Sequence, residues 1–182
     1  MENTENQNNN FINLPTSANI PFPQLVDITP SSRTVQILKE LAYSAQSEMT
    51  ALATYLYQDW ALYPTNPDIA NEMEKIGVVE MTHLDALSNA IVSFGGKPNY
   101  TYEGSIWSAN NVNFSTSLPQ IMYENIRAEQ RAISDYEYAI EHVDNQSLKE
   151  MFKKIIADER NHIAIFQAII DSFDNYQNNQ KT

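Results

Sequence analysis

The sequence predicts an all-α fold, an antiparallel bundle of four long helices. Apolar residues recur at alternating steps of four and three over long stretches, which is the spacing of a helix face packed against other helices. Only four glycines occur in 182 residues, which favours long uninterrupted helices. The two halves of the chain repeat one pattern at offsets of 79 and 81 residues. The chain is therefore expected to consist of two copies of one helical hairpin.

Residues 1–30 are an Asn- and Pro-rich segment ahead of the first expected helix. Residues 6–10 have low complexity, and four prolines between positions 15 and 30 interrupt any helix. Apolar residues lie between these prolines in the sequence. Two alternatives follow: the segment packs on its own bundle or on a neighbouring molecule, or it is disordered.

The first helix is expected to begin at the two serines of residues 31–32, which suit an N-cap, and to run to residues 57–60. One acidic residue, Glu48, replaces an apolar residue in a core row. The second helix is expected to begin at residues 66–67, an Asn-Pro pair typical of a helix start, and to end at the two glycines of residues 95–96.

Residues 97–117 show no helical period and contain several aromatic, Asn and Ser residues. In a four-helix bundle such a segment is the long crossover that lets the third helix start at the far end. The third helix is expected to be capped by Ser117, to carry Pro119 in its first turn and to run to about His142. A single acidic residue, Glu129, interrupts one of its core rows.

The fourth helix is expected from about Ser147 to Phe173, and the polar residues 175–182 follow as a C-terminal tail. Residues 31–174 then form one helical domain. A chain of 182 residues is long enough to bury a sizeable core in a single domain.

The pattern Glu-x-x-His occurs twice, at residues 80–83 and 159–162, in matched places of the two hairpins. Positions three apart lie on one face of a helix. In both copies the Glu and His stand in the apolar row, among Ile, Leu and Phe. Buried carboxylates need compensation, and no Lys or Arg lies in either row, so a bound metal is the simplest explanation. The alternative is a hydrogen-bonded polar layer in the core.

The two copies would meet the two single glutamates in the middle of the bundle, which brings together Glu48, Glu80, His83, Glu129, Glu159 and His162. Four carboxylates and two imidazoles are the ligand set of di-iron and di-manganese carboxylate proteins. Oxygen ligands with one imidazole per metal suit Fe or Mn better than Cu or structural Zn. For the two single glutamates the alternative is a buried salt bridge, or a helix phase that does not place them in the core row.

With these residues the chain resembles the ferritin-like superfamily, in particular the rubrerythrin and bacterioferritin type of di-metal carboxylate four-helix bundle, without a rubredoxin domain. The resemblance covers residues 31–174. It implies two Fe ions or two Mn ions per chain, and the choice of metal stays open. The implied bridging ligands, terminal ligands and histidines are, respectively, Glu80 and Glu159, Glu48 and Glu129, and His83 and His162.

The resemblance also implies a contact behind the ligands, in which Asp158 accepts a hydrogen bond from the ring of His83. Such partners orient a ligating ring and tune its basicity. The matching position in the other half is Val79, so the sequence names no partner for the ring of His162.

Two tyrosines, Tyr55 and Tyr136, each follow a single glutamate by seven residues, which is two turns along the same face. They are expected to donate to a ligand carboxylate or to relay an electron, and the alternative is an ordinary buried core residue. The chain also departs from its relatives at two places. Rubrerythrin-like sites usually carry a further Glu at the place of Ile126, and manganese catalases usually lack the ligand that Glu159 supplies.

With 11 Lys and Arg against 23 Asp and Glu, the formal charge is −12, so neither nucleic acid nor a membrane is expected as a partner. The chain has no cysteine, which excludes disulfides, zinc-thiolate sites and a rubredoxin-type iron centre. No apolar run is long enough to span a membrane, and the polar N-terminus lacks the features of a secretory signal. A cytoplasmic location is therefore expected.

These features predict a non-haem di-metal oxidoreductase of the rubrerythrin-like peroxidase or catalase type, which reacts with H2O2 or O2 and acts against oxidative stress. Electrons would come from an external electron-donor protein or from H2O2 itself. One alternative is a ferritin-like protein that binds and oxidises iron, although the short polar C-terminus disfavours a storage cage. Another is a structural bundle with the metal as a staple. A homodimer is expected, since most soluble homo-oligomers are twofold.

Overall fold

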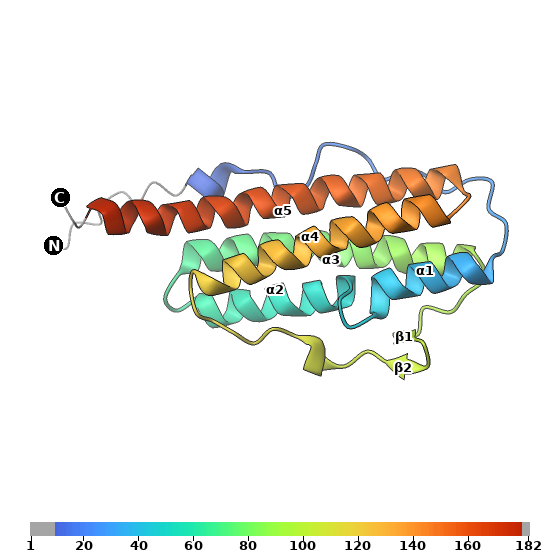
Figure 1. The fold of residues 1–182 in the computed structure, drawn as a ribbon, viewed down its shortest axis with the longest axis horizontal. Coiled ribbons are helices and arrows are strands. Elements are labelled where there is room, and N and C mark those ends of the chain that lie inside the picture. Colours follow the sequence, from blue (N-terminus) through green and yellow to red (C-terminus); the bar gives the residue numbers. More distant parts are fainter. Residues whose placement is uncertain (1–9, 180–182) are drawn as a thin grey trace.

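The computed structural model describes the backbone of residues 10–179 and the side chains of residues 10–174. Long helical rods lie side by side along one axis (Figure 1). The predicted all-α bundle with a long crossover is therefore confirmed. The elements are, in chain order, η1 Asn10–Asn13, α1 Ser32–Tyr43, α2 Glu48–Leu62, α3 Pro67–Ser93, β1 Thr101–Tyr102, β2 Ser105–Ile106, η2 Ala109–Asn111, α4 Gln120–His142 and α5 Gln146–Asn179.

The first rod is not one helix but two, α1 and α2, which lie end to end (Figure 1). The expectation of a single helix over residues 31–60 is therefore wrong. In the break, the Gln46 backbone N–H donates to Ser44 Oγ at 3.3 Å, and Ser47 Oγ donates to the Ser44 carbonyl at 2.8 Å. Serine side chains thus compete with the helical hydrogen bonds. The break makes Glu48 the first residue of α2.

The second rod, α3, begins and ends where the sequence predicts. Pro67 occupies its first turn, where no backbone donor is needed. At the other end Gly95 has φ +90°, a left-handed conformation that favours glycine. The Gly96 backbone N–H donates to the Ile91 carbonyl at 2.7 Å, which satisfies one of the last helical acceptors.

The crossover returns along the length of the bundle, so that α3 and α4 run in the same direction (Figure 1). It contains a short hairpin, in which β1 and β2 pair antiparallel, and the 3-10 turn η2. Two hydrogen bonds fasten it to α2: Trp107 Nε1 donates to Thr50 Oγ1 at 2.9 Å, and the Asn113 backbone N–H donates to Thr54 Oγ1 at 3.3 Å.

The last two rods differ from the prediction at their ends. Helix α4 begins at Gln120, with Pro119 in the N-cap position in place of the expected Ser117. Helix α5 continues to Asn179, beyond the expected end at Phe173. Residues 180–182 of the predicted tail lie outside the described part of the chain.

The apolar core falls into two clusters, one toward each end of the bundle. One cluster contains Leu38, Leu87, Phe152 and Ile155 among others, and the second contains Ile69, Met73, Ile76, Phe166 and Ile169 among others. Each of these nine side chains is at most 6% exposed. The predicted apolar rows of α3 and α5 therefore do face the interior, and a polar layer separates the two clusters.

Residues 10–31 pack on their own bundle, which decides between the two alternatives for this part of the N-terminal segment. They run beside α5 (Figure 1). Phe11 is 2% exposed in the core, and the Val26 backbone N–H donates to Ser147 Oγ at 3.0 Å. We call residues 14–30 the strap. Residues 1–9 lie outside the described residues.

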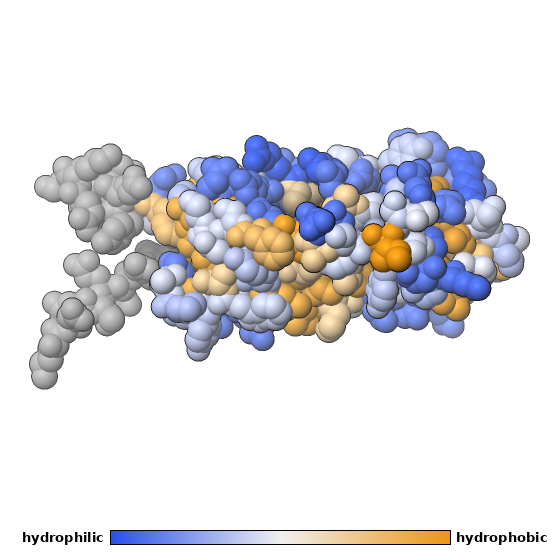
Figure 2. Space-filling model, turned by 90° about the horizontal axis from the view of Figure 1, so that it is seen from below, coloured by the Kyte–Doolittle hydropathy of each residue, from blue (hydrophilic) through white to orange (hydrophobic). Residues whose placement is uncertain are grey.

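The surface carries both polar and apolar residues. On the face seen in Figure 2, apolar residues are interspersed among hydrophilic ones, and hydrophilic residues line the upper edge. Within residues 10–179, none of the helices combines the length and the apolar character that crossing a lipid bilayer requires.

Candidate metal centre

All six residues that the sequence predicts as metal ligands converge in the polar layer between the two core clusters. Each rod contributes: Glu48 from α2, Glu80 and His83 from α3, Glu129 from α4, and Glu159 and His162 from α5. None of the six is more than 5% exposed. The heptad-like spacing explains this placement, because each residue takes a position of the inward-facing row.

The six side chains form two overlapping groups, each with ligand atoms that lie within 4.8 Å of one another. One group is Glu48, Glu80, His83 and Glu159, and the other is Glu80, Glu129, Glu159 and His162. The two Glu-x-x-His glutamates belong to both groups. The arrangement therefore offers two adjacent cation positions that share two carboxylates.

Each histidine has one ring nitrogen, Nδ1, close to three of the carboxylates. His83 Nδ1 lies 3.0 Å from Glu80, 3.3 Å from Glu159 and 3.4 Å from Glu48. His162 Nδ1 lies 2.9 Å from Glu159, 3.1 Å from Glu80 and 3.5 Å from Glu129. One ring nitrogen carries at most one proton, so it cannot satisfy three carboxylates. A multivalent cation bound between the carboxylates would compensate all of them.

Unsatisfied buried atoms support the same conclusion. Glu80 Oε1 and Glu159 Oε1 are buried, and apart from the ring nitrogens at 3.1 and 3.3 Å, with which they form no hydrogen bond, they have no partner among the described residues. Buried polar atoms are normally paired, and a buried unpaired carboxylate is costly. Four carboxylates with imidazoles are hard ligands that fit a pair of Fe or Mn ions. The residues present therefore fit the di-metal centre that the sequence implies.

In the absence of cations, the pKa shifts show that burial and mutual repulsion disfavour the ionised form of carboxyl groups in the cluster. Burial, and then the charge of Glu159, raises the pKa of Glu80 well above its ordinary range. The same two causes raise the pKa of Glu129 to about 7. Burial acts against ionisation of Glu159 as well, but His83 and His162 lower the pKa of that carboxyl to about 2. Without added positive charge, the cluster cannot hold all its carboxylates ionised at neutral pH.

Each terminal glutamate is held by a tyrosine from the opposite hairpin. Tyr55 Oη donates to Glu129 Oε1 at 2.5 Å, and Tyr136 Oη donates to Glu48 Oε1. Both tyrosines are 1% exposed. Burial, followed by neighbouring carboxylates, raises both tyrosine pKa values well above the ordinary value, so both hydroxyls stay protonated and donate. The predicted contacts between these tyrosines and ligand carboxylates are thus observed.

The predicted contact behind His83 is also present, since His83 Nε2 lies 3.0 Å from Asp158 Oδ2. Sequence reasoning missed the residue behind it, Lys154. Its Nζ lies 2.6 and 2.8 Å from the two Asp158 carboxylate oxygens, and the side chain is only 3% exposed. The available signal was the spacing of four between the two residues. It was missed because Lys154 lies outside the apolar row.

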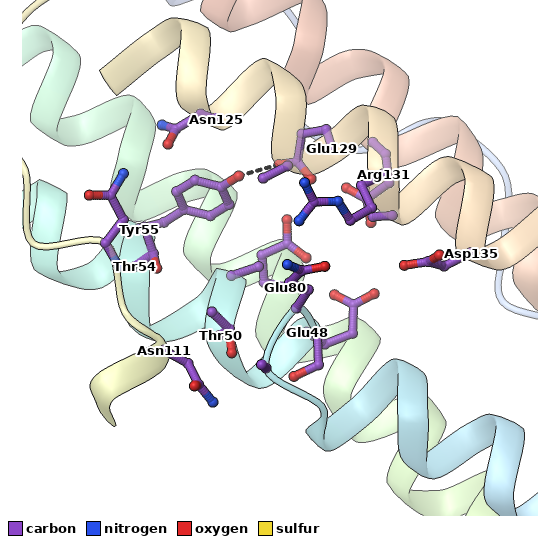
Figure 3. A pocket seen from close by; sticks show the side chains of 18 of the residues that line it. Glu48, Thr50, Thr54, Tyr55, Glu80, Asn111, Asn125, Glu129, Arg131 and Asp135 are labelled. Atoms are coloured by element: carbon purple, nitrogen blue, oxygen red, sulfur yellow. Dashed lines mark hydrogen bonds between the residues drawn. The ribbon is translucent and has the colours of Figure 1, made fainter. Parts of the chain in front are cut away.

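A cavity of about 200 Å³ leads to the cluster from the side of the break between α1 and α2. Its lining includes the exposed residues Gln46 and Arg131 and the buried ligands Glu48, Glu80 and Glu129. Figure 3 shows the three glutamates turned toward one another, with Arg131 and Asn111 also at the pocket. Because the lining runs from exposed to buried residues, the cavity gives small molecules a route to the carboxylates.

Comparisons with known proteins show the family and the fold. The family model of the ferritin-like domain matches residues 38–175. A curated relative, named "Probable manganese catalase" of Clostridium acetobutylicum, is 26% identical over 109 residues, which is 60% of this chain and 45% of the relative. The chain thus spans less than half the length of that relative.

Solved structures show the same fold. Manganese catalase KatB from Anabaena PCC7120 has a TM-score of 0.78 at 21% identity, over 86% of this chain and 80% of that one. Desulfovibrio desulfuricans bacterioferritin has a TM-score of 0.66 at 20% identity, over 79% and 81% of the two chains. Mycobacterium tuberculosis bacterioferritin BfrA has a TM-score of 0.65 at 21% identity, over 81% and 90%.

Proposed function

Because the chain belongs to the ferritin-like family, we propose that it is a non-haem di-metal oxidoreductase that decomposes H2O2, with a pair of Mn or Fe ions as its cofactor. The observation that carries the proposal is the buried cluster of four carboxylates and two imidazoles in two overlapping groups. The names of the relatives, two of which are manganese catalases, support H2O2 as substrate and Mn as the first metal to test.

One ion would be held by Glu48, Glu80, His83 and Glu159, and the other by Glu80, Glu129, Glu159 and His162. A bound pair of Mn or Fe ions would supply reversible two-electron redox chemistry. In the overall reaction one H2O2 loses two electrons and two protons to give O2, and a second H2O2 takes them up to give two H2O. This balance needs no external electron donor, which suits a chain without cysteine-bound iron.

The protein's own residues have three tasks in this proposal. The cavity beside the break admits a small oxidant, while the nearly complete burial of the ligands limits bulk water. Tyr55 and Tyr136 orient Glu129 and Glu48 by donating to one oxygen of each. Asp158 orients the ring of His83 so that Nδ1 faces the ion positions.

The direct test is O2 release from H2O2 by protein loaded anaerobically with Mn(II) or Fe(II), measured with an oxygen electrode. We expect one O2 for every two H2O2 consumed. Glu129→Gln keeps the shape of a ligand but removes its charge, and should lower kcat by about 10²-fold. Glu137→Gln, an exposed position on the same helix, should leave kcat unchanged. Protein that holds two ions per chain yet releases no O2 would contradict the proposal.

The likeness to bacterioferritins favours a second candidate, an iron-binding protein that oxidises Fe(II) with O2. In that case Fe(II) oxidation would be fast at the same site, while H2O2 would be consumed without O2 release. Stopped-flow absorbance during aerobic Fe(II) addition distinguishes this candidate from the first.

A further inference from the structure

The two proposed ion positions differ on the outer side of their histidine rings. His83 Nε2 lies 3.0 Å from Asp158 Oδ2. His162 Nε2 is buried and has no hydrogen-bond partner among the described residues. On the inner side the two rings are alike, since each Nδ1 faces three carboxylates. The asymmetry therefore lies behind the ligands and not in them.

Asp158 is fixed as an ionised acceptor by a dense set of donors. The Lys154 ammonium contacts both of its carboxylate oxygens, at 2.6 and 2.8 Å. The Ala18 backbone N–H and Ser17 Oγ donate to Oδ1 at 2.7 and 3.2 Å. A carboxylate surrounded by donors can only accept, so the remaining contact holds the proton of His83 on Nε2. The lone pair on Nδ1 then points at the ion positions.

The strap completes this arrangement from outside. Lys154 Nζ also contacts Ser17 Oγ at 2.8 Å and the Ala18 carbonyl at 3.0 Å. The ring of Phe22 lies 6.3 Å from the ring of His83, between centroids, and 5.5 Å from Lys154 Nζ. The strap thus covers the Lys–Asp pair, and Asp158 is fully buried. Buried charge-assisted hydrogen bonds are stronger than exposed ones.

The other hairpin lacks this arrangement. At the offset of 79 residues, Val79 stands at the position of Asp158, and Lys75 stands at that of Lys154. Lys75 is half exposed and pairs with Glu72 at 2.7 Å. Within the described part of the chain, no carboxylate therefore contacts Nε2 of His162 in the way that Asp158 contacts His83.

We propose that Asp158, held by Lys154 and the strap, is a positioning residue that makes the ion position at His83 the tighter of the two. The inference rests on the proposed metal pair. Glu48, Glu80, His83 and Glu159 would hold the first Mn(II) ion. Glu129 and His162, with the shared Glu80 and Glu159, would hold the second ion more weakly.

The test is a Mn(II) titration of the metal-free protein by calorimetry, with bound metal counted by elemental mass spectrometry. We expect two steps whose dissociation constants differ by about 10- to 100-fold. Glu129→Gln removes the terminal ligand of the His162 position and should leave the tight step. Glu48→Gln removes that of the His83 position and should leave the weak one.

Asp158→Asn is then introduced into each of these two variants. Lys154 can only donate, so the Asn carbonyl oxygen faces Lys154 and its amide faces His83 Nε2, which moves the His83 proton onto Nδ1. In the Glu129→Gln variant we expect a loss of Mn(II) affinity of about 10- to 100-fold. In the Glu48→Gln variant the affinity should change less than about threefold.

A reciprocal variant keeps the test decisive if Asp158→Asn does not fold. Val79→Asp, made in the Glu48→Gln variant, supplies the missing carboxylate four residues after Lys75 and should tighten the remaining position by about 10-fold. The control is Val78→Asp, at an exposed neighbour, which should have no effect. Circular dichroism confirms folding of each variant.

Two equal dissociation constants in the wild-type protein, or an equal effect of Asp158→Asn in both variants, would overturn the ordering and leave the metal pair standing. No Mn(II) or Fe(II) bound by the wild-type protein would overturn both the ordering and the proposed function. An unchanged affinity with Val79→Asp would contradict the role given to the carboxylate.

Discussion

Two tyrosines tie each hairpin to the terminal glutamate of the other. Tyr55 of the first hairpin donates to Glu129 of the second, and Tyr136 of the second donates to Glu48 of the first. Both hydroxyls are buried beside carboxylates, so each hydrogen bond fixes one oxygen of a terminal glutamate. The two reciprocal hydrogen bonds between the hairpins thus hold both terminal glutamates in place.

Replacing Tyr55 by Phe removes one donor and leaves Glu129 Oε1 without it. We expect the metal-loaded protein to lose about 1–3 kcal/mol of unfolding free energy, the usual cost of an unsatisfied buried acceptor. Urea unfolding measures the change. Tyr57→Phe on the same helix is the control, because the Tyr57 ring stacks edge-on against Phe114 and the substitution keeps that contact. Equal losses in the two variants would contradict the role given to the Tyr55 hydroxyl.

The sequence predicts the six candidate ligands because each one breaks an apolar row, and a polar residue in such a row is visible without a structure. It also predicts Asp158 and both tyrosines, by resemblance and by helical spacing. Lys154 is different. A lysine outside the apolar row is normally exposed, and only the strap, more than 130 residues away in the chain, buries it. Contacts of that kind leave no local pattern.

At the scale of elements, the break between α1 and α2 is the main feature that the sequence does not predict. Residues 44–47 contain no glycine or proline, and their helix propensities are unremarkable. The break arises from serine side chains that bond to nearby backbone groups, which requires a specific local geometry. Its consequence is functional, because residues of the break line the cavity that reaches the carboxylates.

Filling this cavity should slow the reaction without removing the metal. Ala132, which lines the cavity on α4, is the position to enlarge. We expect Ala132→Phe to lower kcat/KM for H2O2 by about 10-fold while the metal content stays at the wild-type value. Ala164→Phe, at an exposed position on α5, is the control. Unchanged kcat/KM in Ala132→Phe would show that the substrate uses another route.

Two glycines, one inside α3 and one just after its end, predict opposite effects on stability. Gly77 is buried against α2, and an added Cβ would meet Leu56 at 3.5 Å, an ordinary contact. Gly77→Ala should therefore raise the unfolding free energy by about 0.5–1 kcal/mol through helix propensity. Gly95 has φ +90°, so Gly95→Ala should lower it by about 1 kcal/mol. Urea unfolding tests both, and a change of the same sign in both variants would contradict this explanation.

At the scale of the molecule, the polar layer divides one apolar core into two. The four rods are joined at mid-length by side chains that repel one another unless positive charge is added. Metal ions would supply that charge, so the bundle's cohesion and its chemistry depend on the same six residues. Removal of the ions should therefore weaken the whole fold and not just the site.

The metal-free protein should lose stability as pH rises from about 5 to 8. The folded state keeps a proton on Glu129 up to a pKa of about 7, whereas the unfolded state releases it near the ordinary value of 4.5. The stabilisation is complete below pH 4.5 and disappears as pH rises through 7. Glu80, His83 and His162, whose pKa values are also raised, add in the same direction. The pKa of Glu159 is lowered to about 2, so its contribution to stability changes in the opposite direction, and only at pH values below 5.

Urea unfolding in the presence of a chelator at pH 5, 6, 7 and 8 measures this dependence. The metal-loaded protein is the control and should show a smaller decline, because bound ions take the place of the protons. A free energy of unfolding that is constant or rises with pH in the metal-free protein would contradict the prediction.

The strap has a consequence for the order in which a newly made chain matures. Ser17 is synthesised early, and its partner Lys154 follows 137 residues later. Both groups of candidate ligands draw on Glu159, which lies in the last helix. Neither ion position can form while the chain is still short, and the strap can close over Asp158 only once α5 exists. Loading with metal thus requires that α5 has been synthesised, and a ribosome-bound fragment ending before α5 should bind no metal pair.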